Sequence, residues 1–255
     1  MEKILQSFDF ALPTTIHYGP GIISRLSSLL KDTGIRRVLV VTDSGIVAAG
    51  LLQEIDQLLT DAAVTYAVYD SVSPNPRDTE VAAGARMGRD TEAQGIIAIG
   101  GGSPIDCAKA INVLVSLGGD HIQSYEGKDR IHGTLLPLFA IPTTAGTGSE
   151  VTFSSVINDT RRQLKMTIKS TRIAPRDALV DPGLTLGLPP SVTAATGMDA
   201  LTHAIEAYTV TQANPISDSM AIKAVALINQ SLVQAYRQGS DLASRSGMML
   251  GSLLA

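Results

Sequence analysis

Short apolar runs alternate with amphipathic segments along the first 185 residues of the chain. The runs are rich in β-branched residues and predict strands that are buried on both faces of a sheet. The segments between them place apolar residues three and four positions apart, which is typical of an amphipathic helix. Strands are therefore expected at 37–42, 64–69, 95–99, 136–141 and 178–180, and helices at 21–31, 49–60, 79–90 and 104–115. The alternation predicts an α/β fold whose N-terminal sheet is mostly parallel with helices on both faces, as in Rossmann-like domains.

The pattern changes near residue 185, after which strand signals disappear. Prolines and glycines between 182 and 190 interrupt it, and three helices are expected beyond them, at about 191–208, 217–236 and from 240 onward. We therefore expect an α/β dinucleotide-binding domain at 1–185 and an all-helical domain at 186–255. The last helix reaches Ala255 without a glycine, proline or basic residue to end it, so we expect the helical domain to be incomplete in this chain.

Composition narrows the class of protein. Hydrophobic residues make up 44% of the 255 positions, and the mean hydropathy is +0.19, which excludes an intrinsically disordered chain. No apolar run approaches the ~20 residues of a membrane span, and the N-terminus lacks a signal-peptide pattern. A net charge of −4 argues against a nucleic-acid partner. The single cysteine, Cys107, fits a reducing compartment, so we expect a cytoplasmic protein. Apolar surface on an incomplete helical domain would favour a homo-oligomer.

A glycine-rich turn links the third predicted strand to the helix that follows it. The strand at 95–99 runs into Gly100, Gly101, Gly102 and Ser103, and Pro104 opens the helix. Glycines let main-chain N–H groups approach a phosphate closely, and the start of a helix adds positive charge. The pattern is neither the G-x-G-x-x-G fingerprint nor a Walker A loop. We favour a pyrophosphate site, and a tight turn without a ligand is the alternative.

Two further strand ends carry candidate nucleotide contacts. Asp43 ends the first of the predicted strands, where a carboxylate suits a ribose diol and repels a 2′-phosphate. Its alternative role is an N-cap for the next helix, which its position alone favours. The turn at 73–76 could form one side of an adenine site, although its spacing favours an ordinary rigid turn.

Two polar segments extend this list. The segment 141–152 (IPTTAGTGSEVT) opens from a strand end into glycines and small hydroxyl residues, which indicates a second phosphate- or ribose-contacting loop. A long polar loop without a ligand is its alternative. The segment 161–172 holds five basic and no acidic residues. Most of these side chains fit a solvated hairpin, and Lys165 is the candidate that reaches toward a phosphate or a ribose hydroxyl.

Asp199 and His203 lie four residues apart on a predicted helix and so share one face. A carboxylate and an imidazole at this spacing can chelate one divalent metal, and their donor atoms suit Fe(II), Zn(II) or Mn(II). Two ligands are too few for a catalytic site, which normally takes about three from the protein. Spacing alone favours an ordinary helical Asp–His pair.

Three of these blocks, GGGSPIDCAK, IPTTAGTGSE and ATGMDALTHAIEAY, together resemble the iron-containing alcohol dehydrogenase family, in order and over essentially the whole chain. The resemblance implies a nucleotide-binding domain, an all-helical domain, and a metal and active site in the cleft between them. It implies NAD and Fe(II) as cofactors. For the adenosine and pyrophosphate, it implies that Asp43 binds the ribose, that Asn75 borders the adenine, and that the pyrophosphate is held by Gly100, Gly101, Gly102 and Ser103, with Asp106 shaping that loop. For the nicotinamide half, it implies that Lys165 meets the ribose and that the lining residues are Thr143, Thr144, Thr147 and Thr152. It also implies that Asp199 and His203 are two of four metal ligands.

The implied function is NAD-dependent hydride transfer between a primary alcohol and its aldehyde, with iron as the Lewis acid. The other two metal ligands of the family are histidines further along the chain, and no histidine follows His203. We therefore expect metal binding and catalysis to be impaired in this chain. Two alternatives stay open. One is a nucleotide-binding fragment without catalysis, and the other is a glycerol-dehydrogenase-like polyol oxidoreductase on the same fold. The D-A-L-T-H-A-I-E block is more similar to the alcohol dehydrogenase branch.

Overall fold

The structure, a computed structural model, describes residues 7–255. Their contacts form two compact units. The sheet unit comprises 13–142 and 149–180, and the helical unit comprises 7–12, 143–148 and 181–255. The domain boundary near residue 185 stays a prediction.

The sheet unit is built on six parallel strands, which confirms the predicted fold class. Its central strands are apolar and fully buried because helices cover both faces of the sheet. The strand order is β1-β9-β6-β4-β2-β3, with bounds β1 Thr15–Tyr18, β2 Arg37–Val41, β3 Thr65–Tyr69, β4 Gly95–Gly100, β6 Leu138–Pro142 and β9 Asp177–Val180. The sequence analysis missed β1, which is an edge strand with the mixed sequence TIHY.

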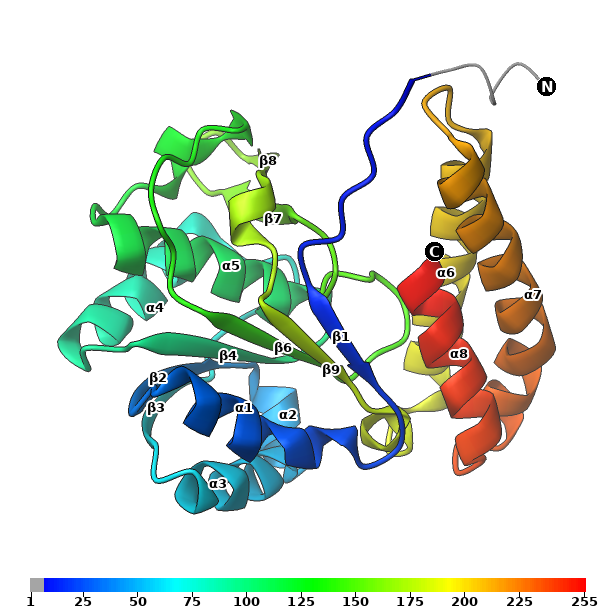
Figure 1. Cartoon of the computed structure of the whole chain (residues 1–255), viewed down its shortest axis with the longest axis horizontal. Coiled ribbons are helices and arrows are strands. Elements are labelled where there is room, and N and C mark those ends of the chain that lie inside the picture. Colours follow the sequence, from blue (N-terminus) through cyan, green and yellow to red (C-terminus); the bar gives the residue numbers. More distant parts are fainter. Residues whose placement is uncertain (1–6) are drawn as a thin grey trace. The chain divides into compact units, whose positions relative to one another are not determined.

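The helices of this unit cover both faces of the sheet (Figure 1). One face carries α4 (Asp78–Asp90) and α5 (Gly102–Leu117), and the other carries α1 (Leu26–Thr33) and α3 (Leu51–Asp61). The helix predicted at 21–31 begins as a 3-10 turn, Ile22–Arg25, before α1. A short helix that was not predicted, α2 (Ser44–Ala48), precedes α3.

A smaller sheet of order β5-β8-β7 belongs to the same unit. Strands β7 (Ser154–Asp159) and β8 (Leu164–Lys169) form an antiparallel hairpin, and β5 (Gly127–Lys128) pairs with β8. Most of the basic segment 161–172 therefore lies in and after a hairpin, the arrangement favoured above for its side chains.

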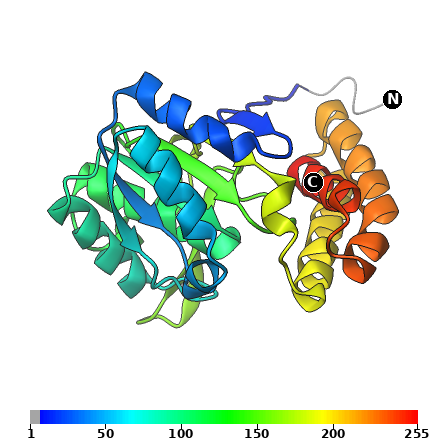
Figure 2. The same ribbon diagram turned by 90° about the horizontal axis from the view of Figure 1, so that it is seen from below.

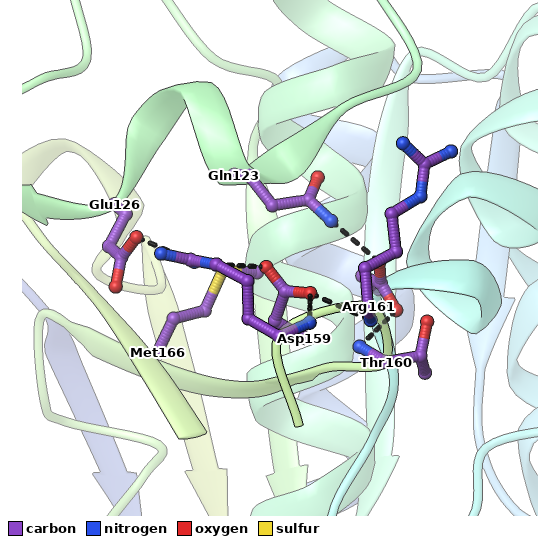
Figure 3. A network of polar contacts seen from close by, with 8 residues as sticks. Gln123, Glu126, Asp159, Thr160, Arg161 and Met166 are labelled. Carbon is purple, nitrogen blue, oxygen red and sulfur yellow. Dashed lines mark hydrogen bonds and ion pairs between the residues drawn. The ribbon is translucent and has the colours of Figure 1, made fainter. Parts of the chain in front are cut away.

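A polar network fixes the tip of this hairpin (Figure 3). Asp159 is buried and accepts hydrogen bonds from the main-chain N–H of Arg162 at 2.9 Å and from its Nε at 2.6 Å. The Arg162 guanidinium also donates to Glu126 at 2.7 Å. These bonds, the main-chain N–H first, hold the pKa of the Asp159 carboxyl below its usual value. Asp78 accepts from Gln123 at 2.6 Å and so joins α4 to the same region.

The helical unit contains three successive helices, which Figure 2 shows from below. They are α6 (Pro190–Thr209), α7 (Pro215–Arg237) and α8 (Leu242–Leu254), preceded by a 3-10 turn, Pro182–Thr185. Helix α7 begins before the predicted residue 217 because Asn214 caps it and Pro215 occupies its first position. None of the described helices is long and apolar enough to cross a membrane.

A buried arginine joins the parts of the helical unit. The Arg245 side chain on α8 donates from Nε to the carbonyl of Gly239 at 2.8 Å and from Nη1 to the Thr193 hydroxyl at 2.7 Å. Its Nη2 donates to the carbonyl of Leu188 at 3.2 Å. None of these three acceptors carries a charge, and burial lowers the pKa of the guanidinium. Arg245 therefore links α8 to the start of α6 and to the α7–α8 connection through three hydrogen bonds to uncharged acceptors.

Candidate nucleotide-binding site

The strand order of the sheet unit defines where a ligand would bind. Strand β2 pairs with β3 on one side and with β4 on the other, so the connections leave β2 and β4 in opposite directions. In open α/β sheets, ligands bind at the carboxyl ends of the strands at such a switch point. Asp43 follows β2 there, and the glycine turn follows β4.

The glycine turn has the geometry that an anion requires. Gly100 has a φ of +141°, and a Cβ atom on it would lie 2.7 Å from Cγ of Pro104. Gly101 is the N-cap of α5, and no side chain caps the helix. The first amide N–H groups of an α-helix have no acceptor within the helix, so they are available to an external anion. The turn therefore fits a pyrophosphate.

Asp43 lies beside this turn and also caps a helix. Its Oδ1 accepts from the main-chain N–H of Ile46 at 3.0 Å, so the capping alternative is present in the structure. Its Oδ2 would lie 3.5 Å from a Cβ atom on Gly100. The carboxylate thus borders the glycine turn with one oxygen while the other oxygen caps α2. Its role toward a ribose stays a prediction.

Three of the predicted cofactor residues, Ser103 of this turn, Asn75 and Lys165, are joined by hydrogen bonds. Asn75 has a φ of +58°, and its main-chain N–H donates to Oγ of Ser103 at 3.3 Å. Its Oδ1 accepts from Nζ of Lys165 at 2.8 Å. The turn after β3, the start of α5 and strand β8 therefore converge on one polar cluster, from residues far apart in the sequence.

Asp106 connects α5 to the segment that precedes and begins β7. Its Oδ1 accepts from the Ser149 hydroxyl, and its Oδ2 accepts from the main-chain N–H of Val156 at 2.9 Å. Its carbonyl accepts from the Ser155 hydroxyl at 2.8 Å. All three contacts go to residues 149–156, and the role of Asp106 in shaping the glycine turn stays a prediction of the resemblance.

The sequence analysis missed a buried lysine one turn further along α5. Lys109 is fully buried, and its Nζ donates to Ser149 Oγ and Thr152 Oγ1, each at 3.0 Å, and to the Ser154 carbonyl at 2.8 Å. The only sign of a buried lysine in the sequence is that Lys109, the last residue of the block GGGSPIDCAK, stands among apolar residues. Its partners lie some 40 residues further along the chain, where sequence spacing does not reveal them.

Two titratable groups of this buried region have shifted pKa values. Burial lowers the pKa of Lys109 to about 8, although the Asp106 and Glu150 charges oppose the shift. Burial also raises the pKa of Glu150 to about 7, against the effects of its main-chain hydrogen bond and the Lys109 charge. Both changes of charge therefore fall close to neutral pH.

Three threonines of the second predicted loop, Thr143, Thr144 and Thr147, belong to the helical unit, whereas Thr152 belongs to the sheet unit. Thr143 is buried, and its hydroxyl has no hydrogen-bond partner within residues 7–255, which leaves the hydroxyl available to a ligand. A Cβ atom on Gly146 would lie 2.9 Å from Cβ of Thr196, so this loop packs closely against α6. Thr144 is half-buried and Thr147 is exposed.

The predicted metal ligands are also in the helical unit. Oδ1 of Asp199 lies 3.6 Å from Nε2 of His203 on α6, and each side chain is about half exposed. The described part of the chain holds no group of three or more His, Cys, Asp or Glu residues that could bind a metal. The pair fits a divalent metal in donor type, but it does not fit a catalytic metal in donor number.

Comparison with known proteins identifies related sequences for both parts of the chain. Residues 13–182 match the family described as iron-containing alcohol dehydrogenase. Residues 193–255 match the C-terminal part of the Fe-containing alcohol dehydrogenase family. Together the two matches cover most of the chain.

Individual relatives agree with these matches. Alcohol dehydrogenase 4 of Saccharomyces cerevisiae (strain ATCC 204508 / S288c) is 42% identical over 246 residues, which cover 96% of this chain and 64% of the relative. The 1,3-propanediol dehydrogenase of Citrobacter freundii is 42% identical over 250 residues, which cover 97% of this chain and 64% of the relative. The chain thus spans about 64% of the length of these relatives.

Solved structures give the same result for the fold. A 1,3-propanediol oxidoreductase has a TM-score of 0.94 at 40% identity, covering 98% of this chain and 65% of that one. A sulfoacetaldehyde reductase from Bifidobacterium kashiwanohense, in complex with NAD+, has a TM-score of 0.89 at 35% identity, covering 98% and 66%. These identities and the two family matches show that the chain belongs to the iron-containing alcohol dehydrogenase family.

Proposed function

We propose that this chain binds NAD and forms the nucleotide-binding part of an oxidoreductase that interconverts a primary alcohol and its aldehyde by hydride transfer. The observation that carries the proposal is the uncapped start of α5 at the glycine turn, beside the Asp43 carboxylate. The relatives named alcohol and 1,3-propanediol dehydrogenases, and the NAD+ complex of a similar structure, support it. NAD supplies the hydride acceptor when it is bound.

Each part of the site then has a defined task. The first N–H groups of α5 bind the pyrophosphate, and Asp43 accepts hydrogen bonds from the adenosine ribose. Asn75 borders the adenine, and Lys165 meets the nicotinamide ribose. Thr152 and the threonines of 143–148 line the nicotinamide half and orient its ring, which reduces the entropy cost of reaching the reactive geometry.

A test of the ribose contact follows from the two roles of Asp43. Asparagine caps helices about as well as aspartate, so Asp43→Asn keeps the bond to Ile46 and removes the charge. We expect it to bind NAD about ten-fold more weakly, because a charged acceptor is lost, and to discriminate less against NADP. Calorimetric titrations with both nucleotides measure these effects. An unchanged NAD affinity together with an unchanged thermal midpoint would limit Asp43 to capping.

The metal belongs to the proposal only in part. Asp199 and His203 would be two ligands of an iron ion, which polarises an alcohol oxygen when it is bound. Because this chain supplies two exposed donors, we assign it no reaction step through the metal. We expect Fe(II) or Zn(II) to be lost on desalting, as measured by elemental analysis. Retention of one metal per chain that His203→Gln abolishes would contradict this expectation.

A second candidate function is nucleotide binding without catalysis, and the incomplete donor set favours it for this polypeptide. A substrate panel of primary alcohols, diols and glycerol separates the alcohol dehydrogenase proposal from the polyol alternative.

We further propose a cytoplasmic homo-oligomer. Cys107 is the single cysteine of the sequence and is a free thiol, which suits a reducing compartment. Exposed apolar residues on α6 and α7, such as Ile205 and Ile222, suit association between copies.

A further inference from the structure

Lys109 makes all its described hydrogen bonds to one short segment of the sheet unit. Its ammonium has three donors, and three oxygens lie at hydrogen-bond distance on residues 149–154: the hydroxyls of Ser149 and Thr152 and the carbonyl of Ser154. The side chain is fully buried, so water does not replace a lost partner easily. The fit of three donors to three acceptors is complete only for the charged form.

The hydroxyls of this cluster have acceptors other than the lysine. Ser149 donates its proton to Asp106, and Thr152 donates to the carbonyl of Ser149 at 3.4 Å. Neither hydroxyl is therefore free to donate to the lone pair of a neutral amine. A neutral Lys109 retains two N–H groups and leaves one of the three acceptors without a bond.

The segment that Lys109 holds leads directly to the proposed nucleotide contacts. Residues 149–154 include Thr152 and run into β7, whose hairpin partner β8 carries Lys165. Asp106, which lies one turn before Lys109 on α5, bonds to Ser149 of this segment and to Val156 of β7. The helix whose start forms the proposed pyrophosphate site is thus joined to the segment that carries Thr152, one of the proposed contacts for the nicotinamide half.

We propose that Lys109 is a positioning residue, which holds segment 149–154 against α5 and thereby sets the affinity of the chain for NAD; this inference rests on the proposed function. Lys109 touches neither the substrate nor the cofactor in this account. It acts through the position of Thr152 and of the hairpin.

The charge on Lys109 gives the proposal a pH dependence. The titratable groups that face it are Asp106 on its own helix, 3.7 Å from Nζ, and Glu150 on the segment. Its pKa of about 8 means that the ammonium predominates below pH 8 and is lost as the pH rises through that value. NAD affinity should therefore fall about five-fold from pH 7 to pH 9, as one hydrogen bond is lost. By linkage, NAD binding near pH 8.5 should take up protons.

The contribution of Lys109 to global stability should change with pH in the opposite direction to NAD affinity. The pKa in the folded protein lies below the ordinary value of 10.5, so the unfolded chain binds more protons between these two values. The contribution of this group to the free energy of unfolding therefore rises with pH above 8. A fall in NAD affinity over that range is then not explained by a loss of folding stability.

The test compares Lys109→Met with Asn112→Leu. Asn112 is a matched control on the same helix: it is also buried, but it bonds to the main chain of Leu136. Calorimetry from pH 6.5 to 9.5 measures NAD affinity and proton uptake. We expect Lys109→Met to bind NAD about ten-fold more weakly at pH 7, with a flat pH profile and no proton uptake. Asn112→Leu should lower stability and keep the NAD affinity, the pH profile and the proton uptake.

Hydrogen exchange of residues 149–156 without nucleotide separates this inference from the proposed function. Exchange of this segment should be faster in Lys109→Met than in Asn112→Leu. Unchanged exchange in Lys109→Met, or an NAD affinity and pH profile that both variants share, would overturn the positioning role. If the unaltered protein fails to bind NAD, the proposed function fails, and exchange alone still decides whether Lys109 holds the segment.

Discussion

Replacing Gly102 with aspartate is expected to abolish NAD binding while the protein stays folded. Gly102 is the first residue of α5, where the main chain is helical and any residue can follow the backbone. The added carboxylate would face the pyrophosphate at the start of the helix. Two unit charges about 4 Å apart repel by about 4 kcal/mol at an effective dielectric constant near 20, which corresponds to about a thousand-fold loss of affinity. Isothermal titration with NAD measures the loss.

The expected effect on folding has the opposite sign. An acidic residue in the first turn stabilises a helix by about 0.3–1 kcal/mol, so the thermal midpoint should be equal or higher. Gly102→Ala is the matched control, since it adds a Cβ atom without a charge, and it should lose far less affinity than the aspartate variant. Equal NAD affinities for the two variants would show that the pyrophosphate does not lie at the start of α5.

Removal of the Arg245 side chain should have the largest effect on stability. In Arg245→Leu the carbonyls of Leu188 and Gly239 and the hydroxyl of Thr193 lose their donor inside the helical unit. Buried acceptors left without a partner cost about 1–3 kcal/mol each, part of which relaxation recovers. We expect a loss of about 3–5 kcal/mol in the free energy of unfolding of the helical unit. Urea denaturation followed by far-ultraviolet circular dichroism measures it.

Arg237→Leu provides the control for this effect. Arg237 lies in the last turn of α7 and is exposed, so its removal should change the free energy of unfolding by less than about 1 kcal/mol. A loss in Arg245→Leu no greater than in Arg237→Leu would mean that the three hydrogen bonds contribute little.

Five of the six strands of the large sheet could be predicted from the sequence, including the partly exposed edge strand β3. Strands β2, β4 and β6 read as apolar runs because every position on them except Arg37 is buried. Strand β1 lies at the edge of the sheet, and its polar Thr15 and His17 hide it from a search for such runs. The hairpin strands alternate in polarity, since one face of the small sheet is exposed.

The candidate site could likewise be predicted only in part from the sequence. The glycine turn and Asp43 were found because each is a local feature at a strand end. The contact between Asn75 and Lys165 joins residues 90 positions apart, and that between Lys109 and Thr152 joins residues 43 apart. Such pairs depend on the crossing of chain segments, which spacing within one segment does not encode. Burial of a charged group, as at Lys109, is likewise a tertiary property.

The proposed ribose contact of Asp43 and its cap of α2 together would restrict how cofactor preference can evolve or be engineered in this chain. A variant that accepts a 2′-phosphate must lose the carboxylate charge, yet the start of α2 still needs an acceptor for the N–H of Ile46 or a residue that tolerates its absence. Serine, threonine, asparagine and glycine meet both conditions, whereas alanine or a larger apolar residue would leave α2 without its cap. The route from NAD to NADP use therefore passes through a narrow set of small side chains.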